Sequence, residues 1–236
     1  MSEMWYTYWL ACVEGITGDR KCELCRKNGS AEAVYYIEEK GIREQIITEK
    51  EWGILKEVRK KGIGGKRIKK WWTGEFRWQS GDRTIIRNGL KNLRECRMRL
   101  FLSGRCHGRE CVGGSVGARR CSSYGEKMTL RFVERLAESG IQIISGMARG
   151  IDAEGHKGAL DTDTPTFAVL GSGVDVCYPN SNRWLYQRIL EKGGGIISEL
   201  PPGSPPVNWA FPARNRIISG LPTWCWSWKH EKEAAP

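Results

Sequence analysis

The sequence predicts an α/β fold, with an extended Rossmann-like, doubly wound and mostly parallel sheet and a small N-terminal helical domain. Short apolar runs alternate with helical patterns after residue 116, at the spacing of β–α–β units. Residues 4 to about 60 show helical patterns instead. The chain has 236 residues, 40% of them hydrophobic, which is enough for one substantial domain and one small one.

Residues 1–62 are predicted to form the small helical domain. Ser30 is a favourable N-cap and begins a helix that runs through Val34 and Ile37. The turn Gly15–Gly18 between short helices is typical of a helix–hairpin–helix element, whose turn amides can bind a DNA backbone. The alternative is a SAM-like helical domain that only packs.

Residues 63–115 are predicted to form an irregular basic segment that is either disordered or out of frame. Their apolar residues follow neither the helical nor the strand period, and Trp, Cys, Arg and Gly are abundant. Residues 61–115 hold 14 Lys and Arg against 4 Asp and Glu, so most of the formal net charge of +11 lies here. Net charge alone is therefore a weak argument for nucleic-acid binding elsewhere in the chain.

Residues 116–221 are predicted to form the Rossmann-like domain. An amphipathic helix runs from Gly125 to Gly140, where glycine suits the C′ position. The remaining expected elements are strands at 141–144, 166–170 and 196–198 and helices near 153–160 and 182–191. In such sheets ligands bind beyond the C-terminal ends of the strands.

The candidate DNA-binding and structural residues follow those strand ends. Glycine-freed amides and guanidinium groups suit phosphate there. Arg149 is expected to bind a phosphate or to pair with Asp152 as a structural clamp, and His156, one turn on, is expected to be structural rather than catalytic. Phe211 is expected to stack on a base. The predicted DNA-binding residues are Gly117, Arg119, Ser145, Gly146, Arg149, Gly171, Gly173, Phe211, Arg214, Asn215 and Arg216, and the predicted structural residues are Asp152, His156, Asp175 and Tyr178.

Cysteine use and the N-terminus favour a cytoplasmic protein without a cofactor or metal. The chain has nine cysteines at irregular spacing and opens without a secretory signal, so we expect reduced thiols. Cys22 and Cys25 form a Cys-x-x-Cys, but no second pair stands at zinc-site spacing. The loop at Gly171–Gly173 lacks the third glycine of a dinucleotide fingerprint. No apolar stretch approaches the length of a membrane span.

Five sequence blocks in order resemble the DprA/Smf family, the DNA-processing proteins of bacterial natural transformation and competence. They lie at 117–125, 145–156, 170–179, 198–203 and 211–221. The resemblance implies a protein that is not an enzyme, binds and protects single-stranded DNA, and helps to load RecA recombinase for DNA recombination. It also implies a homodimer, with phosphates on Arg119, Arg149, Arg214 and Arg216 and a base near Phe211.

The chain departs from the family pattern on both sides of these blocks. Residues 111–116 stand where the family has an apolar first strand, and the Trp-rich residues 222–236 form an aberrant tail where it has a further strand and helix. We hypothesise that residues near 64–115 and 222–236 are translated out of frame. Loss of two strands would expose sheet edges and leave the domain incomplete, which argues against dimer formation and recombinase loading.

Two other functions are compatible with a Rossmann-like domain. One is a nucleotide-binding or nucleotide-hydrolysing enzyme related to the lysine-decarboxylase-like group, although the Pro-Gly-Gly-x-Gly-Thr-x-x-Glu motif of that group is absent from the sequence. The other is a nucleotide-sensing module that uses the Gly171–Gly173 loop. Salt-dependent binding of single-stranded oligonucleotide separates the leading interpretation from both alternatives.

Overall fold

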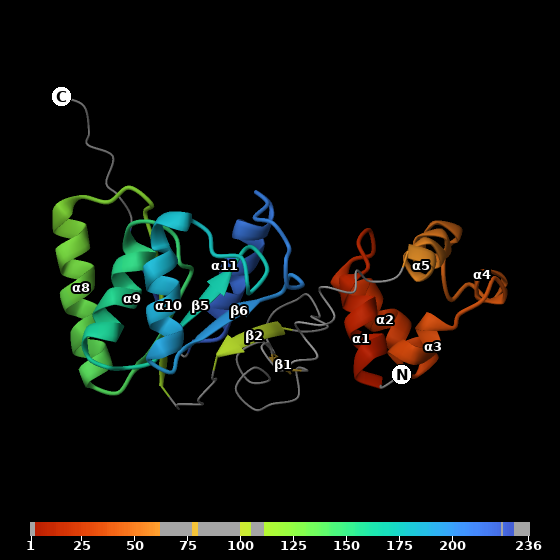
Figure 1. The fold of residues 1–236 in the computed structure, drawn as a ribbon, viewed down its shortest axis with the longest axis horizontal. Helices are drawn as coiled ribbons and strands as arrows, with labels where there is room; N and C mark the ends of the chain where they lie inside the picture. The colour runs from red at the N-terminus through yellow and green to blue at the C-terminus, as the bar shows by residue number, and fades with distance from the viewer. Residues whose placement is uncertain (1–2, 62–76, 80–99, 105–110, 223, 229–236) are drawn as a thin grey trace, which may run out of the picture. The chain divides into compact units, whose positions relative to one another are not determined.

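A computed structural model describes residues 3–61, 77–79, 100–104, 111–222 and 224–228. The chain divides into two compact units (Figure 1). One contains the N-terminal helices, and the other contains the sheet and the helices that cover it. Each unit is described by itself.

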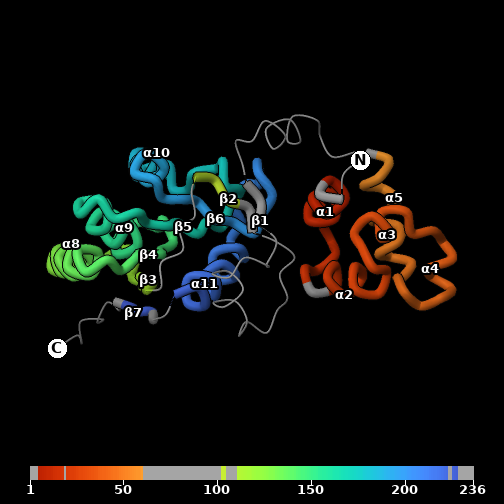
Figure 2. The backbone as a smooth tube through the Cα atoms, turned by 90° about the horizontal axis from the view of Figure 1, so that it is seen from below, coloured from red at the N-terminus to blue at the C-terminus, as the bar shows by residue number. Residues whose placement is uncertain are grey.

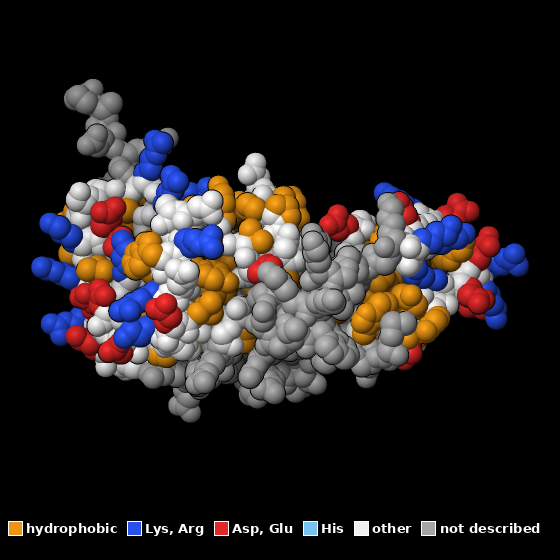
Figure 3. All heavy atoms as spheres, in the orientation of Figure 1, with side chains coloured by type: hydrophobic (Ala, Val, Ile, Leu, Met, Phe, Trp, Pro, Cys, Tyr) orange, Lys and Arg blue, Asp and Glu red, His pale blue; other side chains and the backbone are white. Residues whose placement is uncertain are grey.

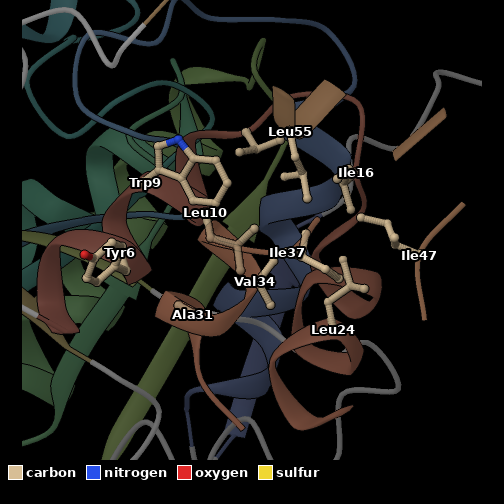
Figure 4. Packing of buried hydrophobic residues seen from close by; sticks show 11 residues of the cluster. Tyr6, Trp9, Leu10, Ile16, Leu24, Ala31, Val34, Ile37, Ile47 and Leu55 are labelled. Carbon is tan, nitrogen blue, oxygen red and sulfur yellow. The ribbon is translucent and has the colours of Figure 1, made fainter. Parts of the chain in front are cut away.

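The N-terminal unit is a small bundle around an apolar core. Trp9, Leu10, Leu24, Val34 and Leu55 are buried together at its centre (Figure 4). These side chains come from different helices, so each helix buries one face against the others. The helices are α1 (Glu3–Cys12), α2 (Gly18–Asn28), α3 (Ala31–Tyr35), α4 (Lys40–Arg43) and α5 (Glu49–Lys61).

Polar caps define where these helices begin. The Ser30 side chain accepts a hydrogen bond from the Ala33 amide, at the helix start that the sequence predicts. That helix ends at Tyr35, earlier than expected. Thr48 and Glu51 each accept the other's backbone amide and form a capping box at the start of α5.

The second unit contains a seven-stranded sheet in the order β1-β2-β6-β5-β4-β3-β7. The strand pairs from β6 to β7 are parallel, and β2 runs antiparallel to β6. This arrangement confirms the mostly parallel sheet. The strands are β1 (Arg77–Gln79), β2 (Leu100–Gly104), β3 (Val112–Gly117), β4 (Gln142–Ser145), β5 (Thr166–Leu170), β6 (Gly195–Ser198) and β7 (Trp224–Trp228).

Helices cover both faces of the sheet. Figure 2 shows α8, α9 and α10 on one side of the strands and α11 on the other. The helices of this unit are α8 (Ser123–Glu138), α9 (Ile151–Asp161), α10 (Arg183–Glu191) and α11 (Ala210–Gly220), with a short 3-10 turn at Asn180–Asn182. Gly140 has φ +82°, as its predicted position just past the end of α8 requires.

Four strands lie wholly or mostly where the sequence predicted irregular or aberrant structure. The strands β1, β2 and most of β3 fall within 63–115, and β7 falls within 222–236, so the prediction is wrong at these residues. Residues 63–76, 80–99, 105–110, 223 and 229–236 of the two segments lie outside the described residues.

The strand β3 forms although glycine is a poor strand former. The strands β4 and β7 flank it on both sides and supply its hydrogen-bonded partners. A Cβ on Gly114 would lie 2.8 Å from the Ile218 carbonyl oxygen and 2.8 Å from Pro222, so glycine permits this close packing. The Trp-rich β7 is an end strand of the order and pairs with β3 alone.

Candidate functional site

The C-terminal ends of β3, β4, β5 and β6 meet at one edge of the sheet, which we call the strand-end edge. The last residues of these strands are Gly117, Ser145, Leu170 and Ser198. The first turn of α11 reaches the same edge, because a Cβ on Gly171 would lie 2.9 Å from the Phe211 ring. The predicted site residues therefore lie on neighbouring loops, as a parallel sheet requires.

Asp152 occupies the position where the sequence predicted an external anion. Its side chain is buried, and its carboxylate accepts hydrogen bonds from the backbone amides of Gly117, Gly146 and Ala148. Burial raises the pKa of this carboxyl, whereas the Arg214 charge and the three amides oppose that shift. The amides that glycine makes available at this strand end are thus used by a carboxylate of the chain itself.

Arg214 is the counterion of Asp152. Their Nη2 and Oδ2 atoms are 3.7 Å apart, and the two side chains are 6% and 4% exposed. The Arg214 guanidinium also donates to the carbonyl oxygens of Gly146 and Val169. Burial lowers the pKa of Arg214 to about 10, and Asp152 opposes that shift. Arg214 is therefore buried in an ion pair within the chain, which disfavours the phosphate contact that the sequence predicted, and the alternative clamp between Arg149 and Asp152 is not formed.

Two more predicted residues lie in the interior beneath this ion pair. The Ser145 hydroxyl donates to the Ser115 carbonyl oxygen at 2.7 Å, so this side chain is not available to DNA. His156 Nδ1 lies 2.8 Å from the Thr166 hydroxyl, which itself donates to the Ile143 carbonyl. The His156 ring therefore donates through Nδ1 and is neutral, and burial lowers its pKa to about 3. This position fits the structural role expected for His156.

Arg119 and Arg149 are exposed cations on the two adjoining loops, and Arg120, next to Arg119, is also exposed. Gly150 has φ +72°, and a Cβ there would overlap the Ala118 carbonyl oxygen, so the loops after β3 and β4 are in backbone contact. The Ile151 amide also donates to the Ala118 carbonyl at 3.3 Å. This contact brings both arginines to one place on the surface. Among the described residues, no ion pair neutralises Arg149.

Phe211 is half-buried within a cluster of side chains. Its ring centroid is 5.4 Å from that of Tyr178, at an interplanar angle of 39°. The Arg119 guanidinium lies over the Phe211 ring at 5.5 Å from the centroid. The structure thus brings together three residues that the sequence placed on three separate loops.

Gly173 and Asp175 hold the loop that follows β5 through hydrogen bonds to a neighbouring segment of the chain. The Gly173 amide donates to the Ser204 carbonyl at 2.9 Å, and Asp175 accepts from the Gly203 amide. A Cβ on Gly173 would lie 2.7 Å from the Pro201 carbonyl oxygen, so the chain itself fills the space beside this loop. This packing is unfavourable for a dinucleotide at the Gly171–Gly173 loop.

An ion pair joins α11 to the residue that follows β6. Arg216 Nη2 lies 3.5 Å from Glu199 Oε2, and Arg216 Nε donates to the Ala213 carbonyl. The exposed Asn215 accepts a hydrogen bond from Arg214 Nε at 3.1 Å.

Sequence reasoning did not identify Asn182 as part of the site. Its side-chain amide donates to the carbonyls of Met147 and Ala148 at 2.9 and 3.2 Å. Met147 has φ +61°, an uncommon conformation for a residue other than glycine. Asn182 therefore stabilises this turn by binding the carbonyls of Met147 and of the next residue. The available signal was an asparagine at the start of a helix, which suggests a cap, but this side chain makes no cap hydrogen bond.

Comparison with known proteins places this site in a family. The family model for DNA recombination-mediator protein A matches residues 82–225, which is more than half of the chain. The chain belongs to the DNA recombination-mediator protein A family. The match includes the strand-end edge and all five sequence blocks that carried the resemblance. It also extends through residues 82–115, which we hypothesised to be partly out of frame.

Curated members of the family share this region at moderate identity. The chain is 44% identical to the protein Smf of Escherichia coli (strain K12) over 123 residues, covering 52% of this chain and 33% of that protein. It is 43% identical to the DNA processing protein DprA of Streptococcus pneumoniae over 106 residues, covering 45% of this chain and 37% of that protein. The matched region is thus about a third of the length of these relatives.

Solved structures of the family have the same fold. The X-ray structure of DNA processing protein A from Streptococcus pneumoniae matches with a TM-score of 0.74 at 26% identity, covering 96% of this chain and 77% of that chain. A structure of DNA processing protein A from Helicobacter pylori, described by its single-stranded DNA binding mode, matches with a TM-score of 0.57 at 23% identity. The latter covers 67% of this chain and 72% of that chain.

Membrane-crossing helices and metal-ligand clusters are both absent from the described residues. None of the helices found there has the length and apolar character that a bilayer crossing demands. Within the same residues, His, Cys, Asp and Glu side chains form no group of three that could hold a metal ion. The described cysteines are Cys12, Cys22, Cys25, Cys111, Cys121, Cys177 and Cys225, and all of them are free thiols.

Proposed function

We propose that this chain binds single-stranded DNA along the strand-end edge and acts in the processing of DNA taken up by natural transformation. The observation that carries the proposal is the contact between the loops after β3 and β4. It brings together the backbone segments that carry the exposed Arg119 and Arg149, and the buried ion pair of Asp152 and Arg214 is already neutralised within the chain. The relatives named as DNA-processing proteins, one of them described with single-stranded DNA, support the same function.

The division of charge supports binding without base sequence preference. Asp152 and Arg214 neutralise each other in the interior, so the loop presents arginine side chains and not free amides. Guanidinium groups pair with phosphates through forked hydrogen bonds, whatever the base. By contrast, Figure 3 shows Lys, Arg, Asp and Glu side chains mixed over the face that α8, α9 and α10 cover, a pattern typical of a solvated surface.

We further propose that the chain binds DNA in the cytoplasm without catalysing a reaction and passes it to a RecA-type recombinase, as the family resemblance implies. The position of His156 supports the absence of catalysis, because its ring is fully buried and neutral. Dimer formation stays a prediction of the resemblance. Sedimentation of the purified chain, alone and with a RecA-type recombinase, tests both partners.

Equilibrium binding of the full chain to a labelled oligothymidylate tests the main proposal. The salt concentration is varied, and a duplex of equal length and free nucleotides serve as competitors. We expect tight binding at low salt that weakens steeply as salt rises, with the single strand preferred over the duplex. Binding of a free nucleotide in preference to the strand would favour the nucleotide-binding alternative.

A further inference from the structure

Tyr178 is the exposed outer ring of a supported aromatic cluster at the strand-end edge. Three neighbours surround the Phe211 ring: the Gly171 backbone, the Arg119 guanidinium and the ring of Tyr178. Phe211 is half-buried as a result, whereas the Tyr178 side chain is 46% exposed. The surface available for stacking therefore belongs mainly to Tyr178, and Phe211 is its support.

The loop that carries Tyr178 is held by its own hydrogen bonds. The Ser172 hydroxyl donates to the Val176 carbonyl at 2.7 Å, and Asp175 accepts from the Gly203 amide on the neighbouring loop. Val174 is fully buried between these contacts. A ring on such a loop loses little conformational freedom on binding, because its backbone is already ordered.

We propose that Tyr178 stacks on a nucleobase of the bound single strand, while Arg119, on the same cluster, contacts the neighbouring phosphate. This inference rests on the proposed function and deepens it, because it assigns the base contact to a residue that the sequence suggested was structural. Every nucleobase has a flat π-face, so stacking on one ring is tolerant of base sequence. The guanidinium 5.5 Å from the supporting ring supplies the charge that the adjacent phosphate requires.

Phe132 provides a matched control in the same unit. It lies on α8, its side chain is 40% exposed, and its ring packs edge-on against Trp226 at 5.5 Å. Phe132 thus resembles Tyr178 in exposure and in having one aromatic neighbour. It differs in lying within the helix and not on a loop at the strand-end edge.

The experiment compares two labelled strands of equal length, an oligothymidylate and an abasic strand with the same number of phosphates. Both are titrated with the full chain and with the variants Tyr178→Leu, Tyr178→Phe and Phe132→Leu. We expect Tyr178→Leu to bind the oligothymidylate roughly tenfold more weakly and the abasic strand unchanged. Tyr178→Phe and Phe132→Leu should bind both strands like the parent chain, and thermal melting should show that every variant is folded.

The outcomes separate this inference from the proposed function. Equal loss on both strands, or no loss on either strand, would overturn the role of Tyr178 while leaving DNA binding intact. Failure of the parent chain to bind either strand would overturn the proposed function itself, and the base contact with it.

Discussion

Arg214 and Asp152 form a buried ion pair at the C-terminal ends of β3, β4 and β5. The carboxylate accepts from the amides of Gly117, Gly146 and Ala148, and the guanidinium donates to the carbonyls of Gly146 and Val169. The ends of the three strands are therefore tied together through one acid and one base. The pair fixes the backbone that carries Arg119 and Arg149, and leaves these two side chains to meet an external anion.

Substitution of Arg214 should destabilise the fold before it affects DNA contact. In the variant Arg214→Ala, Asp152 keeps a buried charge without its counterion, so we expect a loss of about 3–5 kcal/mol in the free energy of unfolding. Arg214→Lys keeps the charge but cannot reach both carbonyls, and should lose less. Denaturant unfolding measures both variants. An Arg214→Ala variant with parental stability and weakened oligonucleotide binding would instead indicate a direct phosphate contact.

The sequence predicted the regular part of this domain well, because periodicity and capping are local properties. The strand 166–170 and the glycine after α8 are found where the patterns put them. The strands β1, β2, β3 and β7 were missed because their formation depends on neighbouring strands and not on their own residues. Sequencing of the coding DNA tests the out-of-frame hypothesis, and one reading frame shared with related genes through both segments would contradict it.

The candidate site shows a similar division. The order of the motifs correctly indicated that they share one edge of the sheet, because parallel strands end together. Sequence spacing could not tell a buried arginine from an exposed one, so Arg214 and Arg149 received the same role. Burial favours one of these roles over the other, and burial of Arg214 in α11 depends on the carboxylate of Asp152 in α9.

Gly146 should be intolerant of any side chain. A Cβ at this position would overlap the Arg214 guanidinium, so Gly146→Ala must displace the ion pair. We expect a loss of about 1–3 kcal/mol in the free energy of unfolding. Gly53 is the matched control, because a Cβ there meets nothing within 4 Å and it lies inside α5. Gly53→Ala should gain about 0.5–1 kcal/mol. Equal effects of the two substitutions in denaturant unfolding would contradict this packing argument.

Arg119 and Arg149 should act on the salt dependence of DNA binding. Removal of one phosphate contact lowers the slope of log affinity against log salt by about 0.7 for a single strand. We therefore expect Arg119→Ala and Arg149→Ala each to reduce the slope by about this amount, and their combination by about twice as much. Arg131, an exposed arginine on α8, is the control. Unchanged slopes in the two site variants would remove these residues from the interface.

His156 should make the stability of the fold depend on pH below neutrality. Its pKa is about 3 in the folded chain, against about 6.5 for an unfolded histidine. Between these values the unfolded chain binds a proton that the folded chain excludes, so stability falls as the pH falls. Above pH 6.5 both states are neutral and the contribution vanishes. We expect His156 to account for a loss of about 2 kcal/mol between pH 7 and pH 5.

Denaturant unfolding of the parent chain and of His156→Asn at both pH values isolates this contribution. Asparagine has a side-chain amide that can replace Nδ1 as the donor to Thr166, but it does not titrate, so the variant should show a flatter pH dependence even if its stability at pH 7 is lower. The raised pKa of Asp152 has the opposite effect on stability, because protonation of its carboxyl favours the folded state as the pH falls. Asp152 is present in both proteins, so its effect cancels when the two pH curves are compared. Parallel pH curves for the two proteins would show that His156 is protonated within the fold, and the neutral ring inferred from its burial would then be wrong.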